Sequence, residues 1–251
     1  MGLVRLHVGD CLEVMREIPD GNMDAVITSP PYNLGKVYEE RAELREYLQL
    51  QRRWIAAAAR VVKHGGAICW QVGNYVRNGR VYPLDLEIYP LFRDLGLVLR
   101  NRIVWTFGHG LHCTRRLSGR HETVLWFSKG NQYTFNLDAI RVPQKYPNKR
   151  HYKGPRKGEL SGNPLGANPG DVWAITNVKH NHPEKTNHPC QFPEGLARRL
   201  VLMATNPGDA VLDPFCGVGT TGVPCVESDR DFHGIDKDAG YIETARKRLA
   251  K

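Results

Sequence analysis

The sequence contains no apolar run that approaches the roughly 18 residues of a membrane-spanning helix. Its first residues, MGLVRLHVGDCLEV, also lack the long apolar segment of a secretory signal peptide. We therefore expect a cytoplasmic protein that has no membrane partner.

Cysteine pairing is also absent from the pattern. The six cysteines form no Cys-x-x-Cys pair and no framework spacing, which favours free thiols in a reducing compartment over a disulfide scaffold. Histidine and cysteine gather at 109–113 and again at 180–190, but neither group matches a common zinc-ligand spacing. We expect no metal site.

Acidic residues are too few to balance the basic ones. The chain has 26 Asp and Glu against 35 Lys and Arg, which gives a formal net charge of +9. This excess of positive charge favours a polyanionic partner, although many basic enzymes bind none. With 251 residues, 41% of them hydrophobic, the chain is long enough to bury the core of one domain.

Short apolar segments alternate with helical ones along most of the chain. Hydrophobic periodicity predicts strands over 5–10, 23–29, 66–73, 100–107, 122–130, 210–215 and 231–236. It predicts helices over 39–66, with Gly65-Gly66 as the stop signal, and over 194–205 and 239–251. Strands separated by helices predict an α/β fold with a doubly wound, mostly parallel sheet. Residues 141–187, which are rich in Pro, Gly, Asn and basic side chains, predict an irregular insertion.

The stretch VLDPFCGVGTTG, residues 211–222, places a strand that carries Asp213 before a glycine-rich turn and a predicted helix N-terminus. Gly217 and Gly219 would let the backbone approach a ligand closely. Asp236 ends the next strand, where an acid can bind both hydroxyls of a ribose. The chain has no phosphate loop, and the third glycine of the dinucleotide spacing is missing, since Gly222 comes one residue early. The pattern favours a nucleoside cofactor without a pyrophosphate.

The stretch AVITSPPYNLG, residues 25–35, ends a buried strand on a serine and two prolines. Consecutive prolines lack N–H donors and fix φ, so they hold the Pro30 carbonyl in a rigid geometry. Ser29 Oγ and the Pro30 carbonyl are hydrogen-bond acceptors at the tip of this strand, and Tyr32 adds an aromatic ring beside them.

These motifs resemble those of the amino-group DNA methyltransferases that use S-adenosylmethionine. TSPPY resembles the catalytic motif, DPFCGVGTT resembles the cofactor motif, and the catalytic motif comes first, as in the β group of that family. The segments 7–15, 119–130 and 188–201 resemble three further motifs in family order. The resemblance implies a Rossmann-like fold and S-adenosylmethionine as the cofactor. It also implies flipping of the target base out of double-stranded DNA. The exocyclic amino group of cytosine or adenine is a poor nucleophile, because its lone pair is delocalised into the ring. The resemblance implies that Ser29 Oγ and the Pro30 carbonyl accept its hydrogens, and that Tyr32 stacks on the base.

The resemblance also implies roles for single residues. The catalytic residues would be Ser29, Pro30, Pro31 and Tyr32, and the cofactor-binding residues Asp10, Asp213, Phe215, Gly217, Gly219, Thr220 and Asp236. Asn33 and Lys36, just past the turn, are further candidates for contact with the flipped nucleotide. Structural interpretations stay open: Ser29 as a strand-end cap, Tyr32 as a rim residue, Asp213 as a cap of the glycine-rich turn and Asp10 as a helix N-cap. Phe215 would then be a core aromatic, and Thr220 and Thr221 would cap the following helix.

Basic residues gather in two segments that are candidates for DNA binding. The insertion begins with RVPQKYPNKRHYKGPRKG (141–158), which has no acidic residue, and the segment 108–121 precedes a predicted strand. A run of this kind is often only a solvated surface, but interleaved aromatic residues favour contact with phosphates and grooves. Five to seven phosphate contacts would give a salt slope of roughly -5 to -6. The predicted DNA-binding residues are Arg115, Arg116, Arg120, Lys145, Lys149, Arg150, Lys153, Arg156 and Lys157.

We therefore predict one methyltransferase domain. Residues 1–140 would form a catalytic half, 141–187 a target-recognition insertion, and 188–251 a cofactor half. Serine before the prolines favours cytosine N4 over adenine N6 as the methylated atom, within the resemblance. A homodimer and a cognate restriction endonuclease are further partners that the family implies. Methylation of RNA or protein, and DNA binding without catalysis, are the alternatives.

Overall fold

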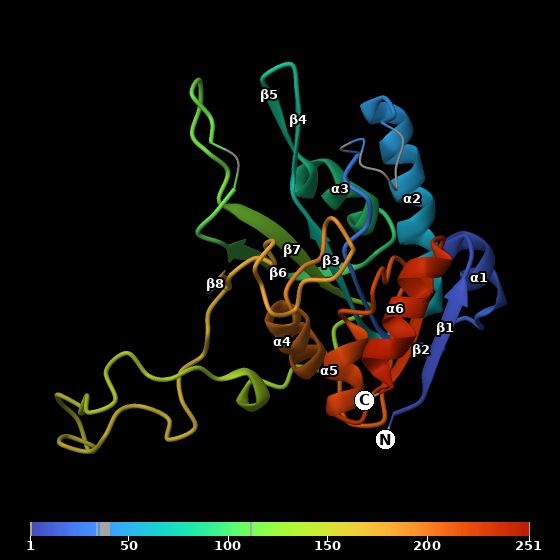
Figure 1. The fold of residues 1–251 in the computed structure, drawn as a ribbon. Coiled ribbons are helices and arrows are strands. Elements are labelled where there is room, and N and C mark those ends of the chain that lie inside the picture. Colours follow the sequence, from blue (N-terminus) through green and yellow to red (C-terminus); the bar gives the residue numbers. More distant parts are fainter. Residues whose placement is uncertain (1, 34, 36–40, 111, 251) are drawn as a thin grey trace.

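The computed structural model describes residues 2–33, 35, 41–110 and 112–250, and within them eight strands form one sheet. The strand order is β1-β10-β9-β2-β3-β7-β6-β8 (Figure 1). These strands are β1 (Val4–Val8), β2 (Met23–Thr28), β3 (Val62–Val72), β6 (Val98–Thr106), β7 (His121–Ser128), β8 (Val172–Ala174), β9 (Ala210–Asp213) and β10 (Asp231–Asp236).

The sheet is mostly parallel, as the sequence predicts. The neighbours from β1 to β3 all run parallel, and so do β6 and β8. Strand β7 is the exception, since it runs antiparallel to both β3 and β6. No helix separates β6 from β7 in the described residues, so the chain returns without a crossover and the pair is antiparallel.

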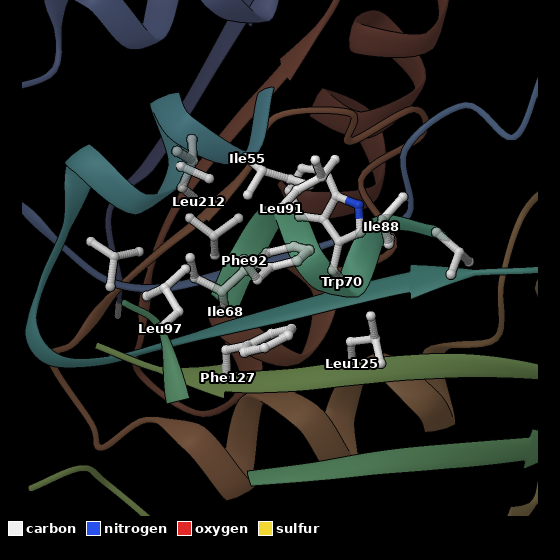
Figure 2. Packing of buried hydrophobic residues seen from close by; sticks show 14 of the residues in the cluster. Ile55, Ile68, Trp70, Ile88, Leu91, Phe92, Leu97, Leu125, Phe127 and Leu212 are labelled. Atoms are coloured by element: carbon white, nitrogen blue, oxygen red, sulfur yellow. The ribbon is translucent and has the colours of Figure 1, made fainter. Parts of the chain in front are cut away.

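Helices cover both faces of the sheet. One face packs against α1 (Cys11–Glu17), α2 (Leu44–Val61) and α3 (Leu84–Arg93), and the other against α4 (Glu194–Ala204), α5 (Gly222–Glu227) and α6 (Ala239–Leu249). Strand residues alternate between the two cores: Val26 lies in the first, and Ala25 and Ile27 lie in the second. Figure 2 shows the first core, where Trp70 and Phe127 of the sheet meet Phe92 of α3.

The predicted end of the helix over 39–66 is wrong. This helix, α2, ends at Val61, and Gly65-Gly66 lie inside β3. Gly65 has a φ of +84°, and a Cβ on Gly66 would lie 2.6 Å from the Asp24 carbonyl oxygen. The register with β2 shifts between Met23 and Ala25. The two glycines therefore form an irregularity in a strand, where the neighbouring backbone leaves no room for side chains.

Several elements lie outside the predicted pattern. Helices α1 and α3 and the hairpin of β4 (Asn74–Arg77) and β5 (Arg80–Pro83) are additions to it. Within the predicted insertion, β8 joins the edge of the main sheet and buries Trp173. The segment before β8 includes a short 3-10 turn (Asp138–Ile140) and isolated bridges, and it extends away from the helices (Figure 1). In the described residues, no helix is long and apolar enough to cross a membrane.

Candidate active site

A cavity of about 840 Å³ opens at the edge of the sheet where the parallel strands end. Ligands of α/β proteins bind at this edge, because the loops that follow parallel strands converge there. The predicted site residues that line the cavity are Asp10, Ser29, Pro30, Pro31, Tyr32, Phe215 and Asp236. The Ser-Pro-Pro-Tyr turn after β2 and the segment after β9 therefore share one cavity, although most of the chain separates them.

The Ser-Pro-Pro-Tyr turn is fixed by hydrogen bonds at both ends. Tyr32 Oη lies 2.9 Å from Ser29 Oγ, and Tyr47 Oη donates to the Pro31 carbonyl at 3.0 Å. Burial, together with the charge of Glu122, raises the pKa of Tyr32 well above its usual value. Tyr32 is therefore a neutral hydrogen-bonding group in the wall of the cavity.

Asp213 is placed differently from a residue that contacts a ligand. Asp213 is 1% exposed. It is not among the described residues that line the cavity. Its carboxylate accepts hydrogen bonds from Thr28 Oγ1 and Thr221 Oγ1, each at 2.6 Å, and from the Phe215 backbone N at 3.1 Å. Burial raises the pKa of Asp213 to about 6. The geometry corresponds to the structural interpretation, in which Asp213 holds the glycine-rich turn against β2.

Neighbouring protein segments leave little room for side chains in the glycine-rich turn. Gly219 has a φ of +76°, and a Cβ there would lie 2.9 Å from Cβ of Ala245 on α6. Gly217 has a φ of +50°, and a Cβ would meet the His188 ring at 3.2 Å. Of the described residues, neither these glycines nor Thr220 line the cavity. Thr221 stands at the N-cap position of α5, as expected, but its hydroxyl donates to Asp213 and makes no side-chain cap.

Acidic side chains lie at the ends of β1 and β10. Asp236 accepts from the Gly217 N and the Asp238 N, each at 2.9 Å, and burial raises its pKa. Asp10 caps α1 by accepting from the Leu12 N, as the structural interpretation predicts, and it also forms an ion pair with Lys237 at 2.9 Å. Burial raises the pKa of Asp10, but hydrogen bonds from Lys237 and Leu12 outweigh it, and the pKa lies below its usual value.

Aromatic side chains form an apolar part of the same cavity. Phe215 packs edge-on against Trp54 of α2, with ring centroids 4.9 Å apart, and both residues line the cavity. His188 packs against Tyr241 of α6 at 4.6 Å, and these two also line it. Burial, and then the charge of Lys185, lowers the pKa of His188 to about 4, so its ring is neutral at pH 7. Phe215 is thus both a packed aromatic and a wall of the cavity.

Sequence reasoning missed several residues of this site. Glu122 and Gln71 line the cavity beside Tyr32, and Tyr32 Oη donates to Glu122 Oε2 at 3.2 Å. Gln71 Nε2 donates to the same carboxylate oxygen. Glu122 stands at the start of a predicted strand, and Trp54 in a predicted helix, where nothing in the local pattern separates a wall of a cavity from a surface or core residue.

The predicted DNA-binding residues lie outside the cavity wall, as far as the structure describes it. Arg115, Arg116 and Arg120 belong to the loop between β6 and β7, and nearby residues of that loop, Phe107, His109 and Gly110, line the cavity. The insertion holds the other six, and Arg156 pairs there with Glu159 at 2.8 Å.

The two residues proposed just past the turn differ in outcome. The Asn33 side chain is buried and exchanges two hydrogen bonds with the Ala42 backbone. It holds its own loop, so the predicted nucleotide contact is wrong for its side chain. Lys36 lies outside the described residues.

Comparison with known proteins agrees with this geometry. The family model for DNA methylases of the N6/N4 type matches residues 23–247. The Type II methyltransferase M.BglII of Bacillus subtilis is 51% identical over 249 residues, which cover 99% of this chain and 69% of that protein. The DNA adenine methyltransferase YhdJ of Escherichia coli K12 is 33% identical over 248 residues, which cover 96% of this chain and 81% of that protein.

Solved structures share the fold. The cytosine-N4-specific PvuII DNA methyltransferase superimposes with a TM-score of 0.80 at 20% identity, over 99% of this chain and 87% of that one. A protein described as a DNA modification methylase from Thermus thermophilus, solved in complex with S-adenosyl-L-methionine, has a TM-score of 0.71 at 27% identity. The match covers 99% of this chain and 93% of that one. The chain thus belongs to the family of S-adenosylmethionine-dependent DNA methyltransferases that modify the exocyclic amino group of cytosine (N4) or adenine (N6).

Proposed function

We propose that this protein methylates N4 of cytosine within a specific sequence of double-stranded DNA, on a base that is flipped into the cavity. The observation that carries the proposal is the single cavity that joins the Ser-Pro-Pro-Tyr turn to the strand ends of the cofactor motif. Ser29 and the Pro30 carbonyl would accept the hydrogens of the target amino group, and the Tyr32 ring would stack on the base. Holding both reactants in one cavity supplies proximity and alignment, which account for much of the catalysis of a group transfer.

The residues at the other side of the cavity fit a cationic nucleoside cofactor. Asp236 would bind the ribose hydroxyls, Asp10 would lie on the adenine side, and the rings of Phe215 and Trp54 would contact the methionine part; all four residues line the cavity. S-adenosylmethionine supplies an electrophilic methyl group on a sulfonium when it is bound. Gly217 would act through its N–H, which holds Asp236, and Asp213, Gly219 and Thr220 would keep the turn in shape.

The choice of cytosine over adenine rests on Ser29. In the family that the motifs resemble, serine before the prolines favours cytosine N4 and aspartate favours adenine N6. The relatives carry both descriptions: PvuII methyltransferase is cytosine-N4-specific and YhdJ is an adenine methyltransferase. Adenine N6 is therefore the second candidate, with the same mechanism.

The basic residues would bind the DNA backbone. Arg115, Arg116 and Arg120 lie in the loop that reaches the cavity, and they would hold the strand beside the flipped nucleotide. The basic residues of the insertion would contact phosphates farther along the duplex. They are Lys145, Lys149, Arg150, Lys153, Arg156 and Lys157. A homodimer and a cognate restriction endonuclease are partners that this assignment includes.

The test is nucleoside analysis of DNA incubated with the purified protein and S-adenosylmethionine. Mass spectrometry of digested, previously unmethylated genomic DNA is expected to detect N4-methylcytosine. N6-methyladenine would keep the mechanism and overturn the choice of base. If neither product forms although the cofactor binds, the protein acts on RNA or protein or binds DNA without catalysis.

A further inference from the structure

Four side chains form a continuous chain of hydrogen bonds along the wall of the cavity. Ser29 Oγ lies 2.9 Å from Tyr32 Oη, which lies 3.2 Å from Glu122 Oε2. Gln71 Nε2 donates to the same Glu122 oxygen. All four residues line the cavity, and they come from the turn after β2, from β3 and from β7.

The protonation state of Glu122 determines the direction of this chain. An ionised carboxylate only accepts hydrogen bonds, so Tyr32 must donate its single proton to it. Tyr32 then accepts from Ser29, and the lone pairs of Ser29 Oγ are left to face the cavity. A protonated Glu122 can instead donate to Tyr32, which reverses the chain and turns the Ser29 proton toward the cavity. The first arrangement leaves both lone pairs of Ser29 Oγ for an amino group, whereas the second uses one of them for Tyr32 and points a proton at the amino group. The first arrangement is therefore the better acceptor.

We propose that Glu122 is a positioning residue that acts through Tyr32 to make Ser29 Oγ an acceptor for the target amino group, and that it receives the proton which this amino group loses. The inference deepens the proposed function and rests on it. It also gives Tyr32 a task for its hydroxyl, in addition to the stacking of its ring.

The proton balance requires an acceptor of this kind. The amino nitrogen uses its lone pair to form an N–C bond to the methyl group. The S–C bond of the donor breaks, and the sulfur keeps the bonding pair. The methylated nitrogen must then lose one proton. Ser29 Oγ accepts that proton while its own proton moves to Tyr32 Oη, and the Tyr32 proton moves to Glu122. Glu122 ends as a neutral carboxylic acid and returns to the carboxylate by losing the proton to water.

The polar side chains that hydrogen-bond to Glu122, among the described residues, are Tyr32 and Gln71. A Cβ on Gly73 of the neighbouring segment would lie 3.4 Å from the Glu122 carboxyl carbon. Trp105 of β6 is its partner across the strand pair, and Tyr47 of α2 lies behind Tyr32. Other titratable groups line the same cavity: Asp10, Cys11, His109, His188, Cys190, Asp236, Lys237, Asp238 and Tyr241. Burial raises the pKa of Glu122 above its usual value, so loss of the active arrangement is expected at a higher pH than for an exposed carboxylate.

The test compares single-turnover methylation rates over a range of pH for wild type, Glu122→Gln, Tyr32→Phe and Glu227→Gln. Glu227 is a matched control, because it pairs with Arg198 on the surface. The wild-type rate is expected to fall as pH decreases through the pKa of Glu122. Glu122→Gln keeps an acceptor but cannot take a proton, so its rate should be roughly 100-fold lower and should lose this decline. Tyr32→Phe keeps the aromatic ring but removes the hydroxyl that links Ser29 to Glu122. Its rate and pH profile should resemble those of Glu122→Gln.

A second measurement needs neither DNA nor cofactor. Infrared difference spectra of the isotope-labelled protein, titrated with acid, should contain a carboxyl band that is absent from Glu122→Gln and shifted in Tyr32→Phe. Inactive wild type would refute the proposed function, whereas the infrared titration would still report on the network. An active Glu122→Gln variant with the wild-type pH profile, or a Glu122 band that Tyr32→Phe leaves unchanged, would overturn the inference. If Glu122→Gln does not fold, Tyr32→Phe carries the same test.

Discussion

At the scale of single residues, Asp213 joins two parts of the site that lie 185 residues apart in sequence. It accepts from Thr28 at the end of β2 and from Thr221 and the Phe215 backbone after β9. Buried carboxylates are costly unless they are hydrogen-bonded, and here three donors offset part of that cost. A residue of this kind fixes the Ser-Pro-Pro-Tyr turn relative to the glycine-rich turn.

Asp213→Asn should change how stability depends on pH. The folded-state pKa of Asp213, about 6, lies above the unfolded value of 3.8, so the folded protein binds the proton more tightly. Its contribution is therefore favourable at low pH and is lost as pH rises through 6, by about 3 kcal/mol. The asparagine variant should gain stability relative to wild type between pH 4.5 and 7.5, as measured by urea unfolding. Asp94→Asn, at the surface end of α3, is the control, and an equal difference at both pH values would contradict the prediction.

At the scale of elements, the glycine-rich turn is shaped by the helix beneath it. Gly219 lies against Ala245 of α6, so this turn and α6 cannot separate without loss of packing. Gly79 in the β4–β5 hairpin has nearly the same φ, +77°, but nothing lies within 4 Å of the position of its Cβ. Alanine at position 79 would therefore meet backbone strain alone, whereas alanine at position 219 would meet backbone strain and a steric clash.

Gly219→Ala should therefore destabilise the fold more than Gly79→Ala. Both variants force alanine into the left-handed region, at about 1 kcal/mol. Gly219→Ala adds overlap with Ala245, which brings its cost to roughly 2–4 kcal/mol. Urea unfolding of both variants measures the difference, and equal losses would show that the contact with α6 has no role.

The basic insertion is the element that we expect to contribute most to the salt dependence of DNA binding. Replacing Lys149, Lys153 and Lys157 together by glutamine should weaken DNA binding and make its salt dependence less steep by about 2 to 3 in log-log slope. Fluorescence anisotropy of a labelled duplex over a series of KCl concentrations measures this slope. Glutamine at Arg16, Arg93 and Lys247, on α1, α3 and α6, gives a control of equal charge change. An unchanged slope in the first variant would mean that this insertion does not contact phosphates.

At the scale of the whole molecule, the cavity brings together segments from both ends of the chain. Its wall includes Asp10 near one end, Ser29 and Glu122 from the first half, and Asp236 and Tyr241 near the other end. Strand β1 pairs with β10, so the N-terminal strand lies beside the C-terminal one. A ligand in this cavity therefore holds distant segments together.

Saturation with S-adenosylmethionine should stabilise the whole fold. At about 100 times its dissociation constant the ligand adds roughly 2.7 kcal/mol to the free energy of unfolding. For a chain of this length that raises Tm by roughly 5–10 °C. Differential scanning fluorimetry should record one transition that shifts in wild type and in Asp231→Asn, whose side chain lies at the far end of β10. Asp236→Ala should lose the shift, and an undiminished shift would contradict the assigned cofactor side.

Local patterns in the sequence predicted much of the fold and the outline of the site. Alternating strands and helices predicted a mostly parallel sheet, and the family of the chain and its fold are confirmed by the comparisons. The residues Ser29 to Tyr32 and Asp236 were identified because rigid prolines, glycines and strand-end acids leave a mark within a few positions. Their individual roles stay predictions.

The tertiary structure decided what depends on contacts between distant positions. Glu122 reaches Tyr32 across 90 residues, because β7 returns antiparallel beside β3 and brings its first residues to the edge where β2 ends. Gly65 and Gly66 read as a helix stop, yet they lie in β3, where Gly65 has a positive φ and the Asp24 carbonyl leaves no room for a side chain on Gly66. A short pattern encodes what a residue can do, but packing between strands and helices decides which residues meet. The hydrogen-bonding groups of the Ser-Pro-Pro-Tyr turn were therefore predictable from its own residues, whereas the contact between Tyr32 and Glu122 was not.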